Sequence, residues 1–127
     1  MNRPPNKGQG KILIIDDDEV MSRVLKSFLA GKGYAVSAIC RPEEAEKTID
    51  LEGPDLIFLD YRMSPLTGKD ILERLTVRGV ETPVVMMSAY KRRDGDWEMK
   101  KLGAVKYLAK PFDFAEIELV LKAVFCP

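Results

Sequence analysis

Residues 55–68 of this chain have the sequence DLIFLDYRMSPLTG, and this stretch decides the fold. A short apolar run at 56–59 ends abruptly at one acid, Asp60, which is typical of a buried strand that reaches a loop. Pro65 and Gly68 then break the regular backbone within a few residues. Ligands of open α/β sheets bind beyond the carboxyl ends of the strands, so the position of Asp60 indicates chemistry rather than packing.

Strand-length apolar runs alternate with amphipathic segments along the rest of the chain. The predicted strands cover residues 11–15, 34–39, 56–59, 83–87 and 105–109, and the predicted helices cover about 20–29, 42–51, 69–78 and 113–125. Asp18 and Asp113 are expected helix caps, and Gly33 is the expected left-handed residue after the first helix. A further helix near 94–102 is expected to be short or irregular, because residues 91–96 lack apolar periodicity. Five alternations predict an α/β fold with a parallel sheet between two helical layers.

Length and composition describe an ordinary globular domain. The chain has 127 residues, and its twenty basic and twenty acidic side chains cancel, so direct binding to nucleic acid is not expected. No apolar run is long enough to span a bilayer, and the two widely spaced cysteines are typical of a reduced cytoplasmic chain. We expect a flexible segment over residues 1–10, which is rich in Pro and Gly, and one domain over 11–125. The absence of histidine excludes a histidine base or metal ligand.

Polar side chains follow four of the predicted strands: Asp16 and Asp17, Asp60, Ser88, and Lys110. Parallel strands would bring them to one edge, where two carboxylates about 4 Å apart repel by roughly 4 kcal/mol at an intermediate effective dielectric. A cation would relieve that repulsion. Oxygen ligands favour Mg²⁺, for which Mn²⁺ can substitute. A carboxylate there could accept a phosphoryl group, with the lysine, the hydroxyl and the metal stabilising the transition state.

Four short motifs, in order, resemble those of one family. They are IIDD at residues 14–17, LD at 59–60 with Met63 and Gly68 after it, MSA at 87–89, and YLAKPF at 107–112. Over about residues 11–124 the chain resembles the receiver domain of bacterial two-component response regulators. The resemblance implies a flavodoxin-like fold with strand order 2-1-3-4-5 and five helices.

The resemblance also implies roles for the acidic residues. Asp60 would be the phosphorylated residue. The Asp17 and Asp60 carboxylates and the backbone carbonyl of Arg62 would bind Mg²⁺ directly, whereas Asp16 would act mainly through water. The departures from the family pattern lie in the loop after Asp60, where Ser64 replaces a common proline and Thr67 replaces a common acid before the glycine.

The remaining implied roles concern the switch. Lys110 and Ser88 would each contact a phosphate oxygen, and Tyr107 would change rotamer as Ser88 moves toward the phosphate. This movement would repack the surface formed by the fourth helix, the fifth strand and the fifth helix. The Lys110–Pro111 bond is expected to be cis. We also expect the segment from Tyr90 to Leu102 to become ordered on phosphorylation or partner binding.

Partners follow from the same resemblance. A sensor histidine kinase or a phosphotransfer protein would donate the phosphoryl group, and an output domain or a target protein would respond. Whether phosphorylation produces a homodimer stays open. Arg62 and Tyr90 could shield the acyl phosphate from water or be exposed loop side chains, and Trp97 could face a partner or pack against its own segment. The chain would be a self-dephosphorylating switch rather than a turnover enzyme.

Two alternatives stay open. The first is a receiver-like module that no longer cycles phosphate and acts through protein contacts alone. The second is a metal-dependent aspartyl phosphatase, which usually needs an acid two residues after its nucleophile; Arg62 occupies that position.

Overall fold

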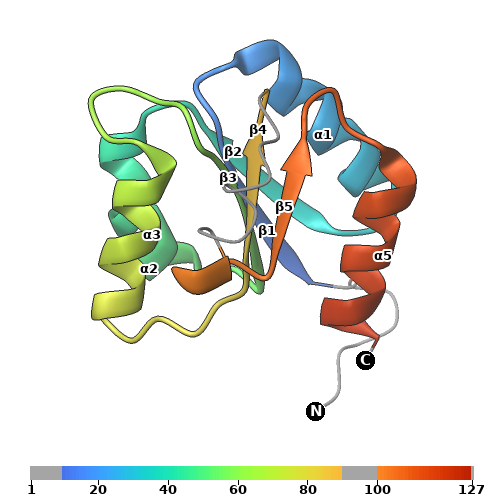
Figure 1. The fold of residues 1–127 in the computed structure, drawn as a ribbon. Helices are drawn as coiled ribbons and strands as arrows, with labels where there is room; N and C mark the ends of the chain where they lie inside the picture. Colours follow the sequence, from blue (N-terminus) through green and yellow to red (C-terminus); the bar gives the residue numbers. More distant parts are fainter. Residues whose placement is uncertain (1–9, 90–99, 127) are drawn as a thin grey trace.

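The computed structural model describes residues 10–89 and 100–126, and its core is one parallel sheet (Figure 1). Five strands pair in the order β2-β1-β3-β4-β5, and every pairing is parallel. The strands are β1 (Lys11–Ile15), β2 (Ala35–Ile39), β3 (Leu56–Asp60), β4 (Val84–Ser88) and β5 (Lys106–Ala109). The predicted sheet and strand order are confirmed, and the predicted ends are within one residue of those observed.

Helices cover both faces of this sheet. Figure 1 shows α2 and α3 on one side and α1 and α5 on the other. Their bounds are α1 (Glu19–Gly31), α2 (Ala45–Glu52), α3 (Gly68–Val77) and α5 (Phe114–Phe125). The predicted caps are confirmed, because the Asp18 and Asp113 side chains accept backbone N–H groups at the starts of α1 and α5. Gly33 has the expected positive φ, of 100°.

The second predicted helix begins later than the sequence suggested. Residues Pro42–Glu44 form a 3₁₀ turn, η2, and the α-helical hydrogen bonding of α2 starts at Ala45. No side chain caps η2, since Arg41 precedes it with an extended backbone and no capping hydrogen bond. A tighter turn is a common start for a helix without a cap.

Two expectations fall largely on residues that the structure does not describe. The expected fourth helix, near 94–102, and the ordering of the segment from Tyr90 to Leu102 concern mainly residues 90–99. Lys100 and Lys101, at the described end of this segment, are helical. Tyr90 and Trp97 lie outside the described residues, as does most of the expected flexible segment 1–10.

The sheet is buried on both faces, so its central strands carry no polar side. Alternate residues of β3 enter different cores: Ile57 and Leu59 pack toward α2 and α3, whereas Leu56 and Phe58 pack toward α1 and α5. All four are fully buried. A strand covered on both faces needs this continuous apolar sequence. Nowhere in the described residues is a helix both long and apolar enough to cross a membrane.

Candidate functional site

The carboxyl ends of the strands bring the predicted side chains to one edge of the sheet. Asp60 pairs in register with Met87, and Ser88 pairs with Ala109 on the next strand. Asp16 follows β1, and Lys110 follows β5. Residues that are 94 positions apart in the chain, Asp16 and Lys110, therefore meet in a direct contact.

Lys110 lies between two buried carboxylates. Its Nζ is 2.7 Å from Asp16 Oδ2 and 3.2 Å from Asp60 Oδ1. The exposed fractions of Asp16 and Asp60 are 1% and 5%, so both negative charges have been taken out of bulk water. Burial of that kind is tolerated only when the charge is paired or coordinated, and here one ammonium serves two acids.

A third acid completes a cluster that fits a hard cation. Asp16, Asp17 and Asp60 each offer a carboxylate oxygen, and these oxygens lie within 4.8 Å of one another. Asp17 is exposed, so the cluster opens to solvent on its side. The other Asp16 oxygen, Oδ1, accepts the Asp18 N–H at 2.9 Å, which fixes the orientation of that carboxylate. Carboxylate oxygens are ligands that Mg²⁺ takes in proteins, where it keeps several waters and also binds phosphate oxygens.

The site holds three acids and one ammonium, so the negative charge around Asp60 is only partly neutralised. Burial raises the pKa of Asp60 to about 6, with a further contribution from the negative charge of Asp16. The charge and hydrogen bond of Lys110 lower this pKa without restoring the ordinary value. Burial also lowers the pKa of Lys110, but the hydrogen bond and charge of Asp16, together with Asp60, outweigh burial and raise it. Lys110 is therefore a cation at neutral pH, and Asp60 is an acid whose ionised form would gain from a second cation.

The loop after Asp60 closes back on the strand. The Tyr61 N–H donates to the Met87 carbonyl at 2.8 Å, and the Tyr61 carbonyl accepts the Gly68 N–H at 2.9 Å. The Arg62 side chain is exposed within this loop. The Lys110–Pro111 bond is cis as predicted, and the Ser64–Pro65 bond is also cis.

The two predicted switch residues are both buried. Ser88 ends β4 with an exposed fraction of 1%, and Tyr107, in β5, has 3%. Tyr107 packs in the core between the sheet and the α2–α3 layer. The structure thus puts Lys110 in contact with both Asp16 and Asp60, places Asp17 beside them, and puts Ser88 at the end of β4.

Sequence reasoning missed two features of this site. One is the Lys110–Asp16 ion pair, which no local pattern announces because the partners come from different strands. The other is the reciprocal hydrogen bonding of Thr67 and Asp70 at the start of α3. The spacing of a threonine and an acid three residues later is the pattern of a capping box, so this second feature could have been found.

Comparison with known proteins places this geometry in one family. The family model for the response regulator receiver domain matches residues 12–122. This chain belongs to the response regulator receiver domain family. This receiver domain has the fold that its four motifs predicted, and Asp60 and Lys110 lie together at the carboxyl ends of its strands.

Relatives of this receiver domain differ in length. Sporulation initiation phosphotransferase F of Bacillus subtilis is 35% identical over 112 residues, which cover 88% of this chain and 90% of that protein. The alkaline phosphatase synthesis transcriptional regulatory protein PhoP of the same organism is 33% identical over 114 residues, which cover 90% of this chain but 48% of that protein. The match to the transcriptional regulatory protein ZraR of Klebsiella oxytoca, 34% identical, covers 89% of this chain and 26% of that one. The chain spans less than half of each of the two transcriptional regulators.

Solved receiver structures superpose closely on this chain. The receiver domain of the Francisella response regulator 1452 matches with a TM-score of 0.87 at 27% identity, covering 92% of this chain and 97% of that one. A two-component response regulator from Clostridium difficile matches with a TM-score of 0.85 at 30% identity, covering 91% and 95%.

Proposed function

We propose that this receiver domain accepts a phosphoryl group on Asp60 and works as a switch in two-component signalling. The contact of Asp60 with Lys110, beside Asp16 and Asp17, carries the proposal. An Asp60 oxygen would attack phosphorus as the P–N bond of a partner's phosphohistidine breaks, and the imidazole would leave with the bonding electron pair. Water would later cleave the acyl phosphate to the carboxylate and inorganic phosphate.

Each side chain of the site would have a distinct part in that reaction. Lys110 would move its ammonium toward a phosphoryl oxygen, and the Ser88 hydroxyl would donate a hydrogen bond to another. Asp17, Asp60 and the Arg62 carbonyl would hold a divalent ion, Mg²⁺ or Mn²⁺, with Asp16 acting through water. That ion would supply positive charge against the oxygens of the transferring group. Tyr107 would turn as Ser88 moves, and the β5–α5 surface would change with it.

The biological setting belongs to the same proposal. A sensor histidine kinase or a phosphotransfer protein would be the donor, and an output domain or separate target would read the change. The similarity to a protein named as a phosphotransferase, over 90% of its length, supports a role in phosphoryl relay. We place the chain in the cytoplasm, where its free thiols Cys40 and Cys126 would stay reduced. It would be a switch with slow self-hydrolysis rather than a turnover enzyme.

The test is labelling by a small acyl phosphate, read as the mass of the intact chain. With Mg²⁺ we expect one added phosphoryl group on the wild type and none on Asp60→Asn. Asp55→Asn is the matched control. Asp55 lies just before β3, at the opposite end of the strand from Asp60, and its side chain accepts the Lys11 N–H at 2.9 Å. Labelling of Asp60→Asn at the wild-type rate, or no labelling of the wild type, would contradict the proposal; the second result would favour a non-cycling interaction module.

A further inference from the structure

The backbone that follows Asp60 is held by the start of α3. A Cβ added at Gly68 would lie 2.2 Å from the Asp60 carbonyl oxygen and 2.9 Å from the Asp60 carbonyl carbon, so no side chain fits there. Gly68 also donates its N–H to the Tyr61 carbonyl at 2.9 Å. The first residue of α3 therefore touches two consecutive carbonyls, those of Asp60 and Tyr61.

The hydrogen bond from Gly68 to Tyr61 closes a loop that contains a proposed metal ligand, the Arg62 carbonyl. Arg62, whose carbonyl would face the divalent ion, is the first residue inside the loop between Tyr61 and Gly68. Because both ends of the loop meet at one hydrogen bond, the path of residues 62–67 depends on where Gly68 lies. A displacement of the α3 start would move this carbonyl relative to the Asp60 carboxylate.

The capping box of Thr67 and Asp70 fixes the α3 start. The Thr67 N–H donates to Asp70 Oδ2 at 3.0 Å, and the Asp70 N–H donates to Thr67 Oγ1 at 3.1 Å. The hydrogen bonds from Thr67 lower the pKa of Asp70, so the carboxylate is ionised at neutral pH and accepts at full strength. Without the Thr67 and Asp70 side chains, the backbone N–H groups that they accept would hydrogen-bond to water instead, and the first turn of α3 would fray.

We propose that Thr67 and Asp70 are positioning residues for the phosphoryl-transfer site, acting through Gly68 on the loop that follows Asp60. Neither residue touches the reacting atoms. Their effect is to hold the Arg62 carbonyl at the distance from Asp60 that a divalent ion requires. This inference rests on the proposed function, because it concerns metal binding and phosphoryl transfer at Asp60.

The experiment compares Thr67→Ala and the Thr67→Ala/Asp70→Ala double variant with wild type. One measurement is Mn²⁺ affinity, by titration in the absence of phosphodonor. The other is the Mg²⁺ dependence of labelling by a small acyl phosphate. We expect Thr67→Ala to weaken Mn²⁺ binding about threefold and to raise the half-saturating Mg²⁺ concentration by a similar factor, with a smaller change in the rate at saturating Mg²⁺. The double variant should show about tenfold effects.

Two further variants separate positioning from general stability. Thr67→Ser retains the capping oxygen and should restore both measurements to within twofold of wild type. Thr76→Ala is the matched control, since it removes a threonine hydroxyl from the other end of α3, where Oγ1 shares its hydrogen between the Leu72 and Leu102 carbonyls at 2.9 and 3.0 Å. It should lower the urea midpoint as Thr67→Ala does, while leaving Mn²⁺ affinity within twofold.

The outcomes distinguish this inference from the proposed function. A wild type that Mg²⁺ and the phosphodonor fail to label would refute the proposed function. A wild type that is labelled, with Thr67→Ala matching it in metal affinity and Mg²⁺ dependence, would overturn the positioning role alone. Equal losses in Thr67→Ala and Thr76→Ala would also overturn it, because stability would then explain both.

Discussion

At the scale of single residues, Lys110 and a divalent ion would compete for the same carboxylates. Lys110 contacts both Asp16 and Asp60, and the oxygens of these acids also belong to the cluster that fits a divalent ion. A positive ammonium lowers the negative potential that attracts a metal ion. The same ammonium is the group that would stabilise phosphoryl oxygens, so its loss should affect binding and transfer in opposite directions.

We therefore expect Lys110→Met to bind Mn²⁺ a fewfold more tightly than wild type and to be labelled at least about a hundredfold more slowly, the usual cost of removing one transition-state contact. Without metal it should also be less stable by about 3 kcal/mol, because Asp16 would be left buried without its cation. Metal titration, labelling kinetics and urea unfolding measure the three effects. Lys106→Met is the control: Lys106 is on the same β5 strand, but pairs with Glu116 at 4.0 Å in an exposed position. Weaker Mn²⁺ binding in Lys110→Met would contradict the expected competition.

A second prediction at this scale concerns pH. The pKa of Asp60 is about 6 in the folded protein, against an ordinary value of 3.8, so the folded protein binds this proton more tightly than the unfolded chain does. The resulting stabilisation is complete below pH 4 and is lost as pH rises through 6. The shift from 3.8 to about 6 corresponds to a loss of up to about 3 kcal/mol.

Urea unfolding of the metal-free protein between pH 4 and pH 7.5 measures this effect. As pH rises over this range, the Asp60→Asn variant should become increasingly more stable than the wild type. Adding Mg²⁺ should reduce this difference in unfolding free energy. Asp50→Asn removes an exposed carboxylate on α2 and is the control for a general change in charge. A pH-independent difference for Asp60→Asn would show that Asp60 does not carry the raised pKa.

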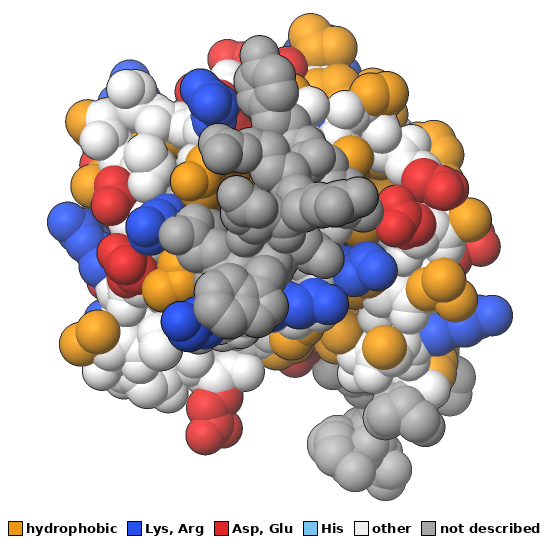
Figure 2. All heavy atoms as spheres, viewed as in Figure 1, with side chains coloured by type: hydrophobic (Ala, Val, Ile, Leu, Met, Phe, Trp, Pro, Cys, Tyr) orange, Lys and Arg blue, Asp and Glu red, His pale blue; other side chains and the backbone are white. Residues whose placement is uncertain are grey.

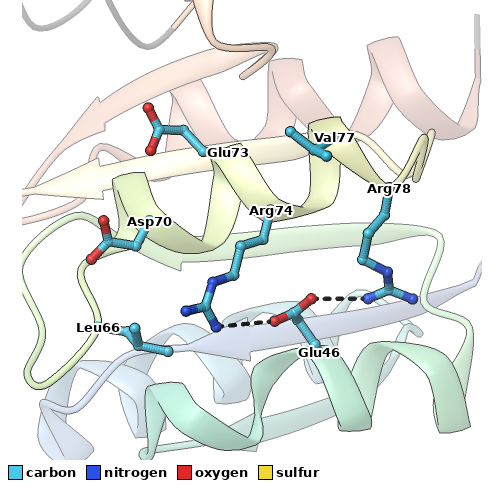
Figure 3. A pocket seen from close by; sticks show the side chains of 7 residues that line it. All are labelled: Glu46, Leu66, Asp70, Glu73, Arg74, Val77 and Arg78. Atoms are coloured by element: carbon cyan, nitrogen blue, oxygen red, sulfur yellow. Dashed lines mark hydrogen bonds and ion pairs between the residues drawn. The ribbon is translucent and has the colours of Figure 1, made fainter.

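At the scale of elements, α2 and α3 are joined by exposed ion pairs as well as by the core beneath them. Figure 3 shows Glu46 between two arginines of the neighbouring helix. Glu46 Oε2 is 3.3 Å from Arg74, Glu46 Oε1 is 3.2 Å from Arg78, and Arg78 also contacts Asp50 at 2.8 Å. These side chains are between about a third and a half exposed, so water and salt screen the attraction.

We expect Glu46→Gln to destabilise the protein by less than about 1 kcal/mol at low ionic strength, and by less still in high salt. Labelling of Asp60 should be unchanged, because the core between the sheet and α3 positions that helix without the ion pairs. Urea unfolding at two salt concentrations and labelling kinetics are the measurements. Glu73→Gln, on α3 with its side chain turned away from Glu46 (Figure 3), controls for the loss of one negative charge. A large loss of stability in Glu46→Gln that high salt does not reduce would mean that Glu46 has a packing role.

The start of α3 shows which structural features local sequence can predict and which it cannot. Thr67 replaces the acid that the family commonly has before this glycine, yet its hydroxyl oxygen accepts a hydrogen bond from the Asp70 N–H in the capping box. The departure from the motif therefore preserves the capping chemistry. The close approach of Gly68 to Asp60 is a different matter, because only the packed chain brings that helix start onto the end of β3.

At the scale of the whole molecule, the parallel sheet explains why one edge holds the site. All five strands point the same way, so the arrowheads of β4 and β5 in Figure 1 end at the edge where Asp60 and Lys110 lie. Charged side chains of both signs surround orange apolar patches on the face drawn in Figure 2, so the described surface there has no single sign of charge. This agrees with the balanced composition, and the described side chains on this face form no broad electropositive surface for nucleic acid.

Sequence alone determined the alternation of strands and helices, the helix caps at Asp18 and Asp113, and the acids at the carboxyl ends of β1 and β3. Those features depend on residues close together in the chain, where periodicity and capping chemistry act directly. Only the tertiary structure decided that Lys110 would bridge Asp16 and Asp60, how far burial would raise the pKa of Asp60, and that Gly68 would lie against its carbonyl. These depend on distances and desolvation between segments far apart in sequence, which are set when the sheet and its two helical layers pack together.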